Sequence, residues 1–206
     1  MGKGLKNIYA MKESFLFLAN GFEEVEALTA VDVLRRAGMP VRTVSITSSL
    51  QVTGAHGVTV KADVIYDSTL FADPAWLILP GGMPGAENLA QFAPLTGLLA
   101  RQLASGEGRI AAICAAPAVV LGRAGLLKGH KATCYPGFEG DLIGAEYVDS
   151  PVVSDDKFVL GNGPANALVW ALAIVDKTLG NDRSRGVANG MLLYPRGNYN
   201  FDFLFG

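Results

Sequence analysis

Cysteine and long apolar runs are scarce in this chain of 206 residues. Its two cysteines, Cys114 and Cys134, allow at most one disulfide and no CxxC metal site, so we expect free thiols. The longest uncharged apolar run, from Ile110 to Gly122, is too short to span a membrane, and the early FLFLA segment is too brief for a signal-peptide core. We therefore expect a cytoplasmic protein with no membrane partner.

An excess of charge of either sign is also missing. Seventeen Lys and Arg stand against nineteen Asp and Glu, without a long block of like charge, so the sequence gives no electrostatic footprint for nucleic acid. A small polar or anionic metabolite remains possible as a ligand. Half of the residues are hydrophobic, which suits one domain over residues 1–206. Residues 1–12 lack a clear periodicity and are expected to form a flexible leader.

Strand-like runs alternate with helical periodicities along the chain. A strand at 14–19, a helix at 23–37 closed by Gly38, and a strand at 40–47 form a βαβ unit, which favours parallel strands covered by helices. Further strands are expected at 75–80, 109–113, 130–135 and 157–161, a hairpin at 50–53 and 57–64, and helices at 92–105, 117–124, 164–179 and 182–192. The helix at 164–179 is apolar almost all round, so it should be buried on both sides or packed against a second subunit.

Cys114 ends a predicted strand where the pattern turns helical, in the segment IAAICAAPAVVLG. Ligands of parallel sheets bind outside the carboxyl ends of the strands, where helix N-terminal amides also lie. Such amides would stabilise a thiolate, and the small neighbours Ala115 and Ala116 would let a substrate approach. The alternative is that Cys114 is only a small buried hydrophobic residue.

Glu26 strengthens the functional interpretation. It shares a helix face with Ala30, Val33 and Ala37, so its carboxyl group points toward the core. A buried carboxyl tends to hold a proton, and a neutral acid can donate a hydrogen bond or transfer a proton near pH 7. The alternative is a carboxylate that caps a backbone amide.

Other polar positions carry weaker signals. Glu23 and Glu24 lie in the first helical turn, where the helix dipole explains them. The glycine-rich loop GGMPGAEN, from residue 81, follows a strand, and its amides could bind an oxyanion. His56 could reach a cleft or simply be solvated, and His130 is given no role. Cys134 and Tyr135 end a predicted strand and could border the same pocket.

Several segments together resemble the ThiJ/PfpI superfamily, especially its protein deglycase branch: GFEEVEAL, VDVLRRAG, LPGGMPGAENL, AAICAAPAVVL and GNGPANAL. The resemblance runs from about residue 14 to 187. It implies a flavodoxin-like, three-layer α/β sandwich, a homodimer and a nucleophilic cysteine at a strained turn. By position, Cys114 matches the nucleophile, Glu26 the carboxyl that bonds it, and the amides of Gly82 and Ala115 the oxyanion site.

The resemblance implies a cofactor-free enzyme, without a metal, that acts on small α-oxoaldehydes or their adducts. An oxidative-stress sensor or redox-regulated chaperone that uses the same cysteine is the alternative. Ala115 stands where the peptidase branch has histidine, and no Walker-type loop supports a role in thiazole monophosphate biosynthesis. Tyr135 stands where the deglycase branch often has histidine, which leaves proton transfer to Glu26 alone or with His56.

Overall fold

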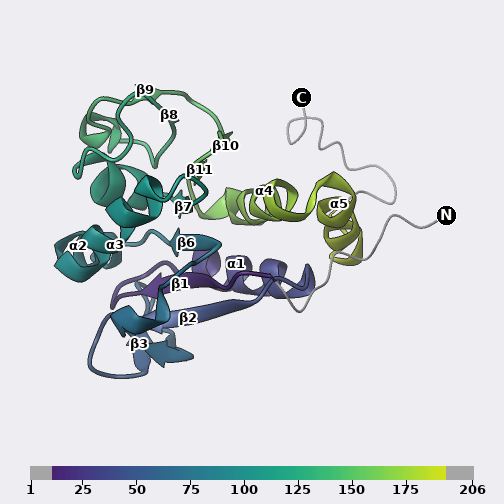
Figure 1. The fold of residues 1–206 in the computed structure, drawn as a ribbon, viewed down its shortest axis with the longest axis horizontal. Coiled ribbons are helices and arrows are strands. Elements are labelled where there is room, and N and C mark those ends of the chain that lie inside the picture. The colour runs from purple at the N-terminus through teal and green to yellow at the C-terminus, as the bar shows by residue number, and fades with distance from the viewer. Residues whose placement is uncertain (1–10, 194–206) are drawn as a thin grey trace.

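A seven-stranded sheet runs through the middle of the molecule (Figure 1). The computed structural model describes residues 11–193, so most of the predicted leader lies outside the described residues. The sheet contains β1 (Ser14–Leu18), β2 (Val41–Ser45), β5 (Val64–Ile65), β6 (Trp76–Leu79), β7 (Arg109–Ile113), β10 (Val152–Ser154) and β11 (Phe158–Gly161). Its strand order is β10-β11-β7-β6-β1-β2-β5, and only the β10–β11 pair is antiparallel. The predicted mostly parallel sheet is confirmed, and its central strands have the flavodoxin-like order 2-1-3-4-5.

Helices cover both faces of this sheet. They are α1 (Glu24–Arg36), α2 (Gly85–Gln91), α3 (Ala93–Ala104), α4 (Ala167–Leu179) and α5 (Asn181–Gly190). In Figure 1, α2 and α3 lie on one side of the sheet, whereas α4 and α5 lie on the other, with α4 packed between α1 and α5. The chain leaves β1 and β6 toward opposite sheet edges, so right-handed crossovers place α1 and α2 on opposite faces.

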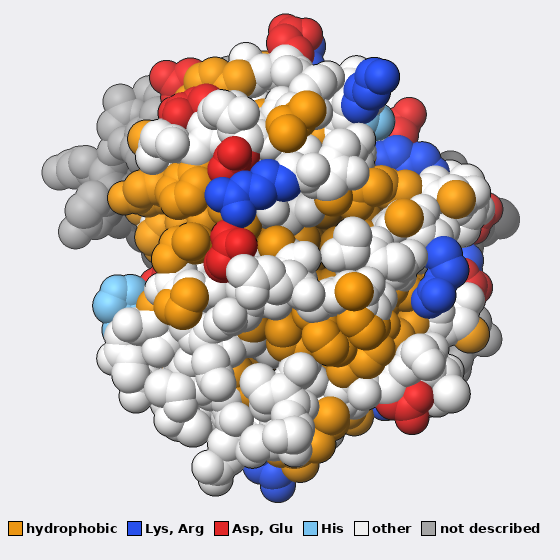
Figure 2. All heavy atoms as spheres, turned by 90° about the vertical axis from the view of Figure 1, so that its left-hand side faces the viewer, with side chains coloured by type: hydrophobic (Ala, Val, Ile, Leu, Met, Phe, Trp, Pro, Cys, Tyr) orange, Lys and Arg blue, Asp and Glu red, His pale blue; other side chains and the backbone are white. Residues whose placement is uncertain are grey.

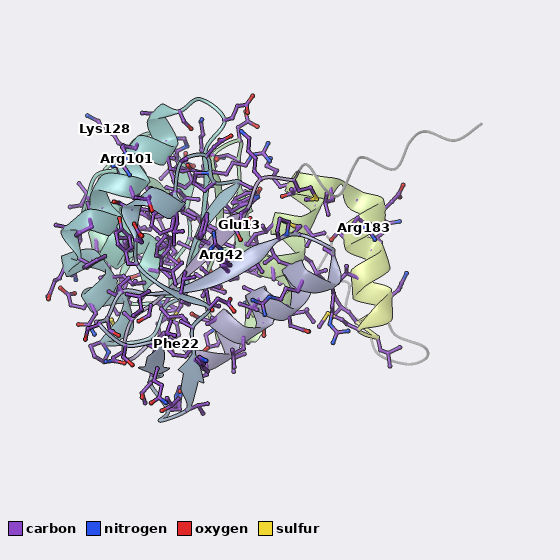
Figure 3. All side chains as sticks on the ribbon, turned by 60° about the horizontal axis from the view of Figure 1, so that its bottom comes forward. Glu13, Phe22, Arg42, Arg101, Lys128 and Arg183 are labelled. Carbon is purple, nitrogen blue, oxygen red and sulfur yellow. The ribbon has the colours of Figure 1, made fainter. Side chains whose placement is uncertain are left out.

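Burial explains why these segments form these elements. Every residue of β1, β6 and β11 is buried, as is typical of parallel strands covered on both faces. An ion pair between Glu13 and Arg42 joins the start of β1 to β2, and Figure 3 labels the two residues close together. Gly38, with φ +79°, ends α1 as predicted. Helix α4 is buried by the sheet, α1 and α5, so packing within the chain accounts for its apolar surface.

Two predicted segments were wrong. The segment GGMPGAEN is not all loop, because α2 begins at Gly85, where a side chain would collide with the backbone of Gly21. Tertiary packing therefore overrides the low helix propensity of glycine. The predicted strand 130–135 shrinks to β8 (Lys131–Ala132), which pairs only with β9 (Glu146–Tyr147), outside the main sheet. The predicted hairpin is confirmed as β3 (Gln51–Thr53) and β4 (Thr59–Lys61).

The surface agrees with the balanced composition. On the face shown in Figure 2, which is the α2–α3 side, charged side chains of both signs are scattered among hydrophobic and uncharged ones, without a large patch of one sign. Within residues 11–193, no helix is both long enough and apolar enough to cross a membrane.

Candidate active site

Three loops meet at the carboxyl edge of the sheet. Strand β1 leads into α1, which carries Glu26; β6 leads into Gly81 and Gly82; and β7 leads into Cys114. The chain leaves β1 and β6 in opposite directions, so this edge is the topological switch point at which open α/β sheets bind ligands. The fold therefore brings together predicted residues that are almost 90 positions apart in the sequence.

Cys114 occupies a strained turn. Its φ of +64° lies in the left-handed region, which costs a non-glycine residue about 1–3 kcal/mol. Two backbone hydrogen bonds hold it there: its N–H donates to Gly161 O at 2.9 Å, and its carbonyl accepts from Tyr135 N at 2.8 Å. Cys114 directly follows β7, which confirms its predicted position at the strand end. The residue is 8% exposed, so the thiol is nearly enclosed.

Glu26 lies beside this turn, fully buried on the helix face that it shares with Ala30 and Val33. Its Oε2 accepts a hydrogen bond of 2.7 Å from Gly81 N, so the carboxyl group binds a backbone amide of another loop. Its Oε1 is buried without a hydrogen-bond partner of normal geometry among the described residues. The second oxygen is thus free to exchange a proton with a neighbouring group.

Burial shifts the pKa of both groups upward. The pKa of Glu26 rises to about 7, mainly through desolvation, while the amide of Gly81 opposes the rise. The pKa of Cys114 rises to about 12, through burial first and the negative charge of Glu26 second. The predicted proton affinity of Glu26 is confirmed. The prediction that local dipoles keep the thiol ionised was wrong, because burial and the adjacent carboxylate outweigh the dipoles.

The two predicted oxyanion donors lie near the sulfur, because the amides of Gly82 and Ala115 lower the pKa of Cys114, although not enough to offset its burial. Gly81 allows the loop to pass close to both side chains. A Cβ at this position would lie 2.6 Å from Cys114 Cβ and 2.9 Å from Glu26 Oε2, which is too close for any other residue. Gly81 was predicted only as part of the glycine-rich loop, although a glycine directly after a buried strand is a signal of close backbone approach.

Gly82→Ala should destabilise the fold by about 3 kcal/mol or more, because Gly82 has a φ of +86° and a Cβ would collide with the backbone of Glu23 and Gly21. Gly97→Ala is the matched control, since Gly97 lies exposed within α3 with open space around it. The control should gain about 0.5–1 kcal/mol. Urea denaturation measures both, and equal stability of the two variants would contradict the tight packing of this loop.

His56 forms its hydrogen bonds with Glu24 rather than with Cys114 or Glu26. Its Nδ1 is 2.8 Å from Glu24 Oε2, and its backbone N–H donates to Glu24 Oε1 at 2.8 Å. The His56 side chain is 72% exposed, and the Glu24 carboxylate raises the pKa of His56. Glu23 caps α1 by accepting from Glu26 N at 2.7 Å. The first-turn acids therefore cap the helix and hold the β3–β4 hairpin.

Glu23, Glu24 and His56 are also the residues best placed to hold a metal ion. Among residues 11–193, this is the group of three whose ligand atoms lie within 4.8 Å of one another. The hydrogen bonds just described already occupy both oxygens of Glu24 and one oxygen of Glu23. The group is satisfied internally, and we assign no metal to it.

Three further residues considered in the sequence are Tyr135, Cys134 and His130. Tyr135 binds the Cys114 carbonyl through its backbone and leaves 45% of its surface exposed. Cys134 is buried and unpaired, and burial together with nearby carboxylates raises its pKa to about 11. His130 pairs with Asp155 at 2.6 Å, consistent with the absence of a predicted role. Both cysteines are free, as predicted.

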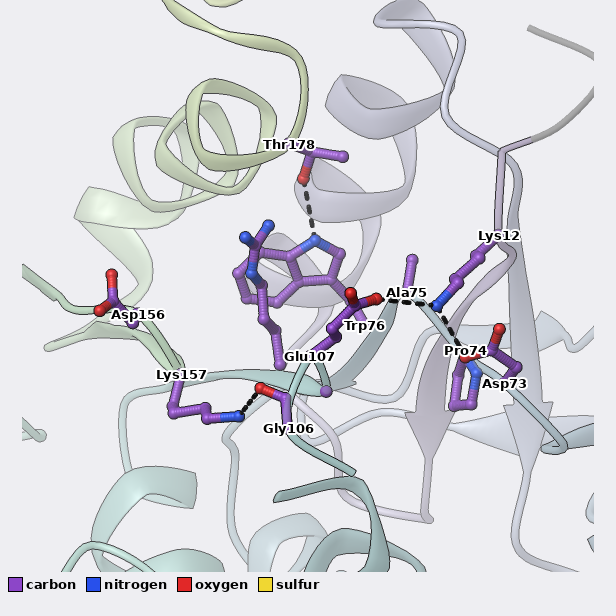
Figure 4. Close-up of a pocket in the computed structure, with 12 residues that line it drawn as sticks. Lys12, Asp73, Pro74, Ala75, Trp76, Gly106, Glu107, Asp156, Lys157 and Thr178 are labelled. Atoms are coloured by element: carbon purple, nitrogen blue, oxygen red, sulfur yellow. Dashed lines mark hydrogen bonds and ion pairs between the residues drawn. The ribbon is translucent and has the colours of Figure 1, made fainter. Parts of the chain in front are cut away.

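A separate hollow of about 520 Å³ lies at the opposite, amino edge of the sheet (Figure 4). Several of its polar groups are engaged with one another: Lys12 binds Asp73 at 2.9 Å, Lys157 binds the carbonyl of Gly106, and Trp76 Nε1 donates to a threonine at 2.9 Å. Because parallel sheets bind ligands at the carboxyl edge, the Cys114 region remains the candidate site.

Fold and site together define a flavodoxin-like α/β protein with a cysteine at a strained turn beside a buried carboxyl group. The sequence profile of the DJ-1/PfpI family matches residues 12–177. The chain belongs to this family, and the resemblance found in its motifs is confirmed.

Individual relatives extend the comparison. The chain is 36% identical to protein DJ-1 homolog B of Arabidopsis thaliana over 89% of its own length, and it spans less than half of this relative and of homolog A. It is 35% identical to deglycase PH1704 of Pyrococcus horikoshii, covering 78% of this chain and 95% of that protein. The structure of oxidised Toxoplasma gondii DJ-1 matches with a TM-score of 0.84 and 35% identity, over 88% of this chain and 98% of that one.

Proposed function

We propose that this chain is a cofactor-free, cysteine-dependent enzyme that acts on small α-oxoaldehydes, such as methylglyoxal, or on their early adducts with amines and thiols. One observation carries the proposal: a strained cysteine lies near two backbone amides and shares its enclosure with a carboxyl group whose pKa is about 7. Two relatives named deglycase, at 34–35% identity, support it.

The nucleophile forms by proton transfer within the pair. Above pH 7 the pair holds about one proton, and the higher pKa of Cys114 places that proton mainly on the sulfur. As the sulfur attacks the aldehyde carbon, the thiol proton passes to Glu26, and the new C–S bond gives a hemithioacetal. The amides of Gly82 and Ala115 stabilise the oxyanion until Glu26 returns the proton to it.

Glu26 then acts as the base and acid of an isomerisation. Its carboxylate takes the proton from the former aldehyde carbon, and the electron pair moves toward the neighbouring ketone to form an enediol. Glu26 gives this proton to the former ketone oxygen, then takes the hydroxyl proton from the former aldehyde carbon and delivers a proton to the former ketone carbon, which gives a lactoyl thioester of Cys114. Water hydrolyses this thioester, which releases lactate and restores the thiol, so no external oxidant or reductant is consumed.

Purified chain incubated with methylglyoxal tests the proposal. We expect one lactate for each methylglyoxal consumed, in a reaction that needs no added thiol and is unaffected by EDTA. An enzymatic assay of lactate against time measures it. Lactate formation no faster than in buffer would overturn the proposal.

His56→Gln should change kcat/KM for methylglyoxal by less than about threefold, because the His56 ring contacts Glu24 rather than the reacting pair. Steady-state kinetics at pH 8 measures the effect. A loss of more than about 30-fold would return His56 to the catalytic role that the sequence had suggested.

A redox sensor, or a chaperone regulated by oxidation, is the second candidate function. The unpartnered Oε1 of Glu26 favours it, because a protonated carboxyl there could donate to an oxidised sulfur. Two equivalents of peroxide would convert the thiol to a sulfinic acid and release two waters. Mass spectrometry after mild peroxide treatment separates the candidates: selective oxidation of Cys114 over buried Cys134, without lactate formation, would favour the sensor.

The homodimer and the cytoplasmic location belong to the same proposal. Val25 and Leu28 are apolar side chains of α1 that remain about half exposed in the single chain. Light scattering of the purified protein should give twice the chain mass of 21.6 kDa, and a mass of one chain would contradict the dimer.

A further inference from the structure

Tyr135 is an exposed aromatic residue tied directly to the proposed nucleophile. Its N–H donates to the carbonyl oxygen of Cys114, so the position of its backbone is fixed relative to the strained turn. Its side chain makes no hydrogen bond through its hydroxyl among the described residues, and 45% of the residue remains exposed. An exposed aromatic ring at the carboxyl edge of the sheet is suited to line a ligand-binding site.

Two neighbouring residues, Phe138 and Gly163, determine how the Tyr135 ring is packed and exposed. The rings of Tyr135 and Phe138 meet edge to face, with centroids 6.5 Å apart, and Phe138 is partly buried. On another side, Gly163 approaches the Tyr135 ring: a Cβ there would lie 3.4 Å from Cδ2 and 3.7 Å from Cε2. Because residue 163 is glycine, it has no side chain that would cover this part of the ring. We call Tyr135 and Phe138 the aromatic ledge.

We propose that the aromatic ledge makes this chain select 2-oxoaldehydes with an aryl or large apolar substituent on the ketone carbon over those with a methyl group. This inference rests on the proposed function. A substrate bound through its aldehyde carbon to Cys114 would direct its other end away from the sulfur, along the ledge. Contact between rings is favourable beyond the burial of apolar area, and it is a contact that a methyl group cannot make.

Steady-state kinetics with phenylglyoxal and methylglyoxal tests the inference in the native chain, Tyr135→Phe and Tyr135→Ala. The ratio of the two kcat/KM values should fall about five- to tenfold in Tyr135→Ala, mainly through a higher KM for phenylglyoxal. Tyr135→Phe keeps the ring and should keep the native ratio. A ratio that is the same in Tyr135→Ala and the native chain would overturn the inference while leaving the proposed function intact.

A second measurement does not depend on turnover. Phenacyl bromide and bromoacetone both alkylate a thiol and differ by the same phenyl-for-methyl exchange. The ratio of their rates at Cys114, followed by mass spectrometry, should fall in Tyr135→Ala and persist in Tyr135→Phe. If neither aldehyde is converted, the proposed function fails, and this ratio still decides the inference: equal ratios in the native chain and Tyr135→Ala would overturn it.

Discussion

Cys114→Ser should lower the rate of lactate formation from methylglyoxal by at least about 10³-fold. Serine has nearly the shape of cysteine, so it should occupy the same turn. An alcohol is a far weaker acid than a thiol, and a carboxylate whose pKa is about 7 cannot draw its proton away before attack. Single-turnover and steady-state assays at pH 8 measure the loss.

Cys134→Ser provides the matched control for this substitution. Cys134 is also buried and unpaired, so the same chemical change is made at a second thiol with a raised pKa. The control should retain activity within about threefold once its folding has been verified by circular dichroism. Equal rates for the native chain and Cys114→Ser would eliminate the covalent mechanism.

Glu26→Gln should lower activity and raise stability at the same time. Glutamine can accept the hydrogen bond from Gly81 N through its carbonyl oxygen, so the loop contact survives. It cannot take up or return a proton, and loss of general acid–base catalysis typically costs about 10²–10⁴-fold in rate. Lactate assays measure the first effect, and urea denaturation measures the second.

The sign of the stability effect follows from the raised pKa of Glu26. Between pH 4.5 and about 7, the folded chain binds a proton that the unfolded chain has released, so the free energy of unfolding falls as pH rises. The penalty is complete above pH 7. The shift from 4.5 to about 7 corresponds to about 3 kcal/mol at most, since the thiol shares the proton.

Glu26→Gln removes this penalty. Its advantage over the native chain should therefore be small at pH 4.5 and grow to about 1–3 kcal/mol at pH 8. Denaturation at the two pH values, in matched ionic strength, gives the comparison. An advantage that is the same at both would mean that Glu26 is ionised across the whole range, and it would contradict the desolvated carboxyl group.

Local patterns in the sequence located the two central side chains. The strand-to-helix change around Cys114 and the apolar face of α1 around Glu26 are short-range signals, and both survive in the structure. The charge state of the thiol could not be read in the same way. It depends on how fully three loops, distant in sequence, enclose the sulfur and how close they bring the carboxylate, which are properties of the packed structure.

The errors in the fold have a similar origin. The segment from Gly81 has the composition of a loop, and only the close approach of Gly21 to Gly85 shows why glycine is needed at the start of α2. The run around Cys134 has strand propensity, but its partner β9 lies outside the main sheet. The choice of partner is a long-range decision that propensity does not encode.

Alkylation of Cys114 by iodoacetamide as a function of pH, in a Cys134→Ala background, tests the central claim most directly: Cys114 and Glu26 share one proton. With Glu26 present, the rate should rise through an inflection near pH 7, level off, and rise again toward pH 12. With Glu26→Gln, the inflection near pH 7 should disappear. A rate already constant below pH 6, or the same profile with and without Glu26, would contradict the shared proton.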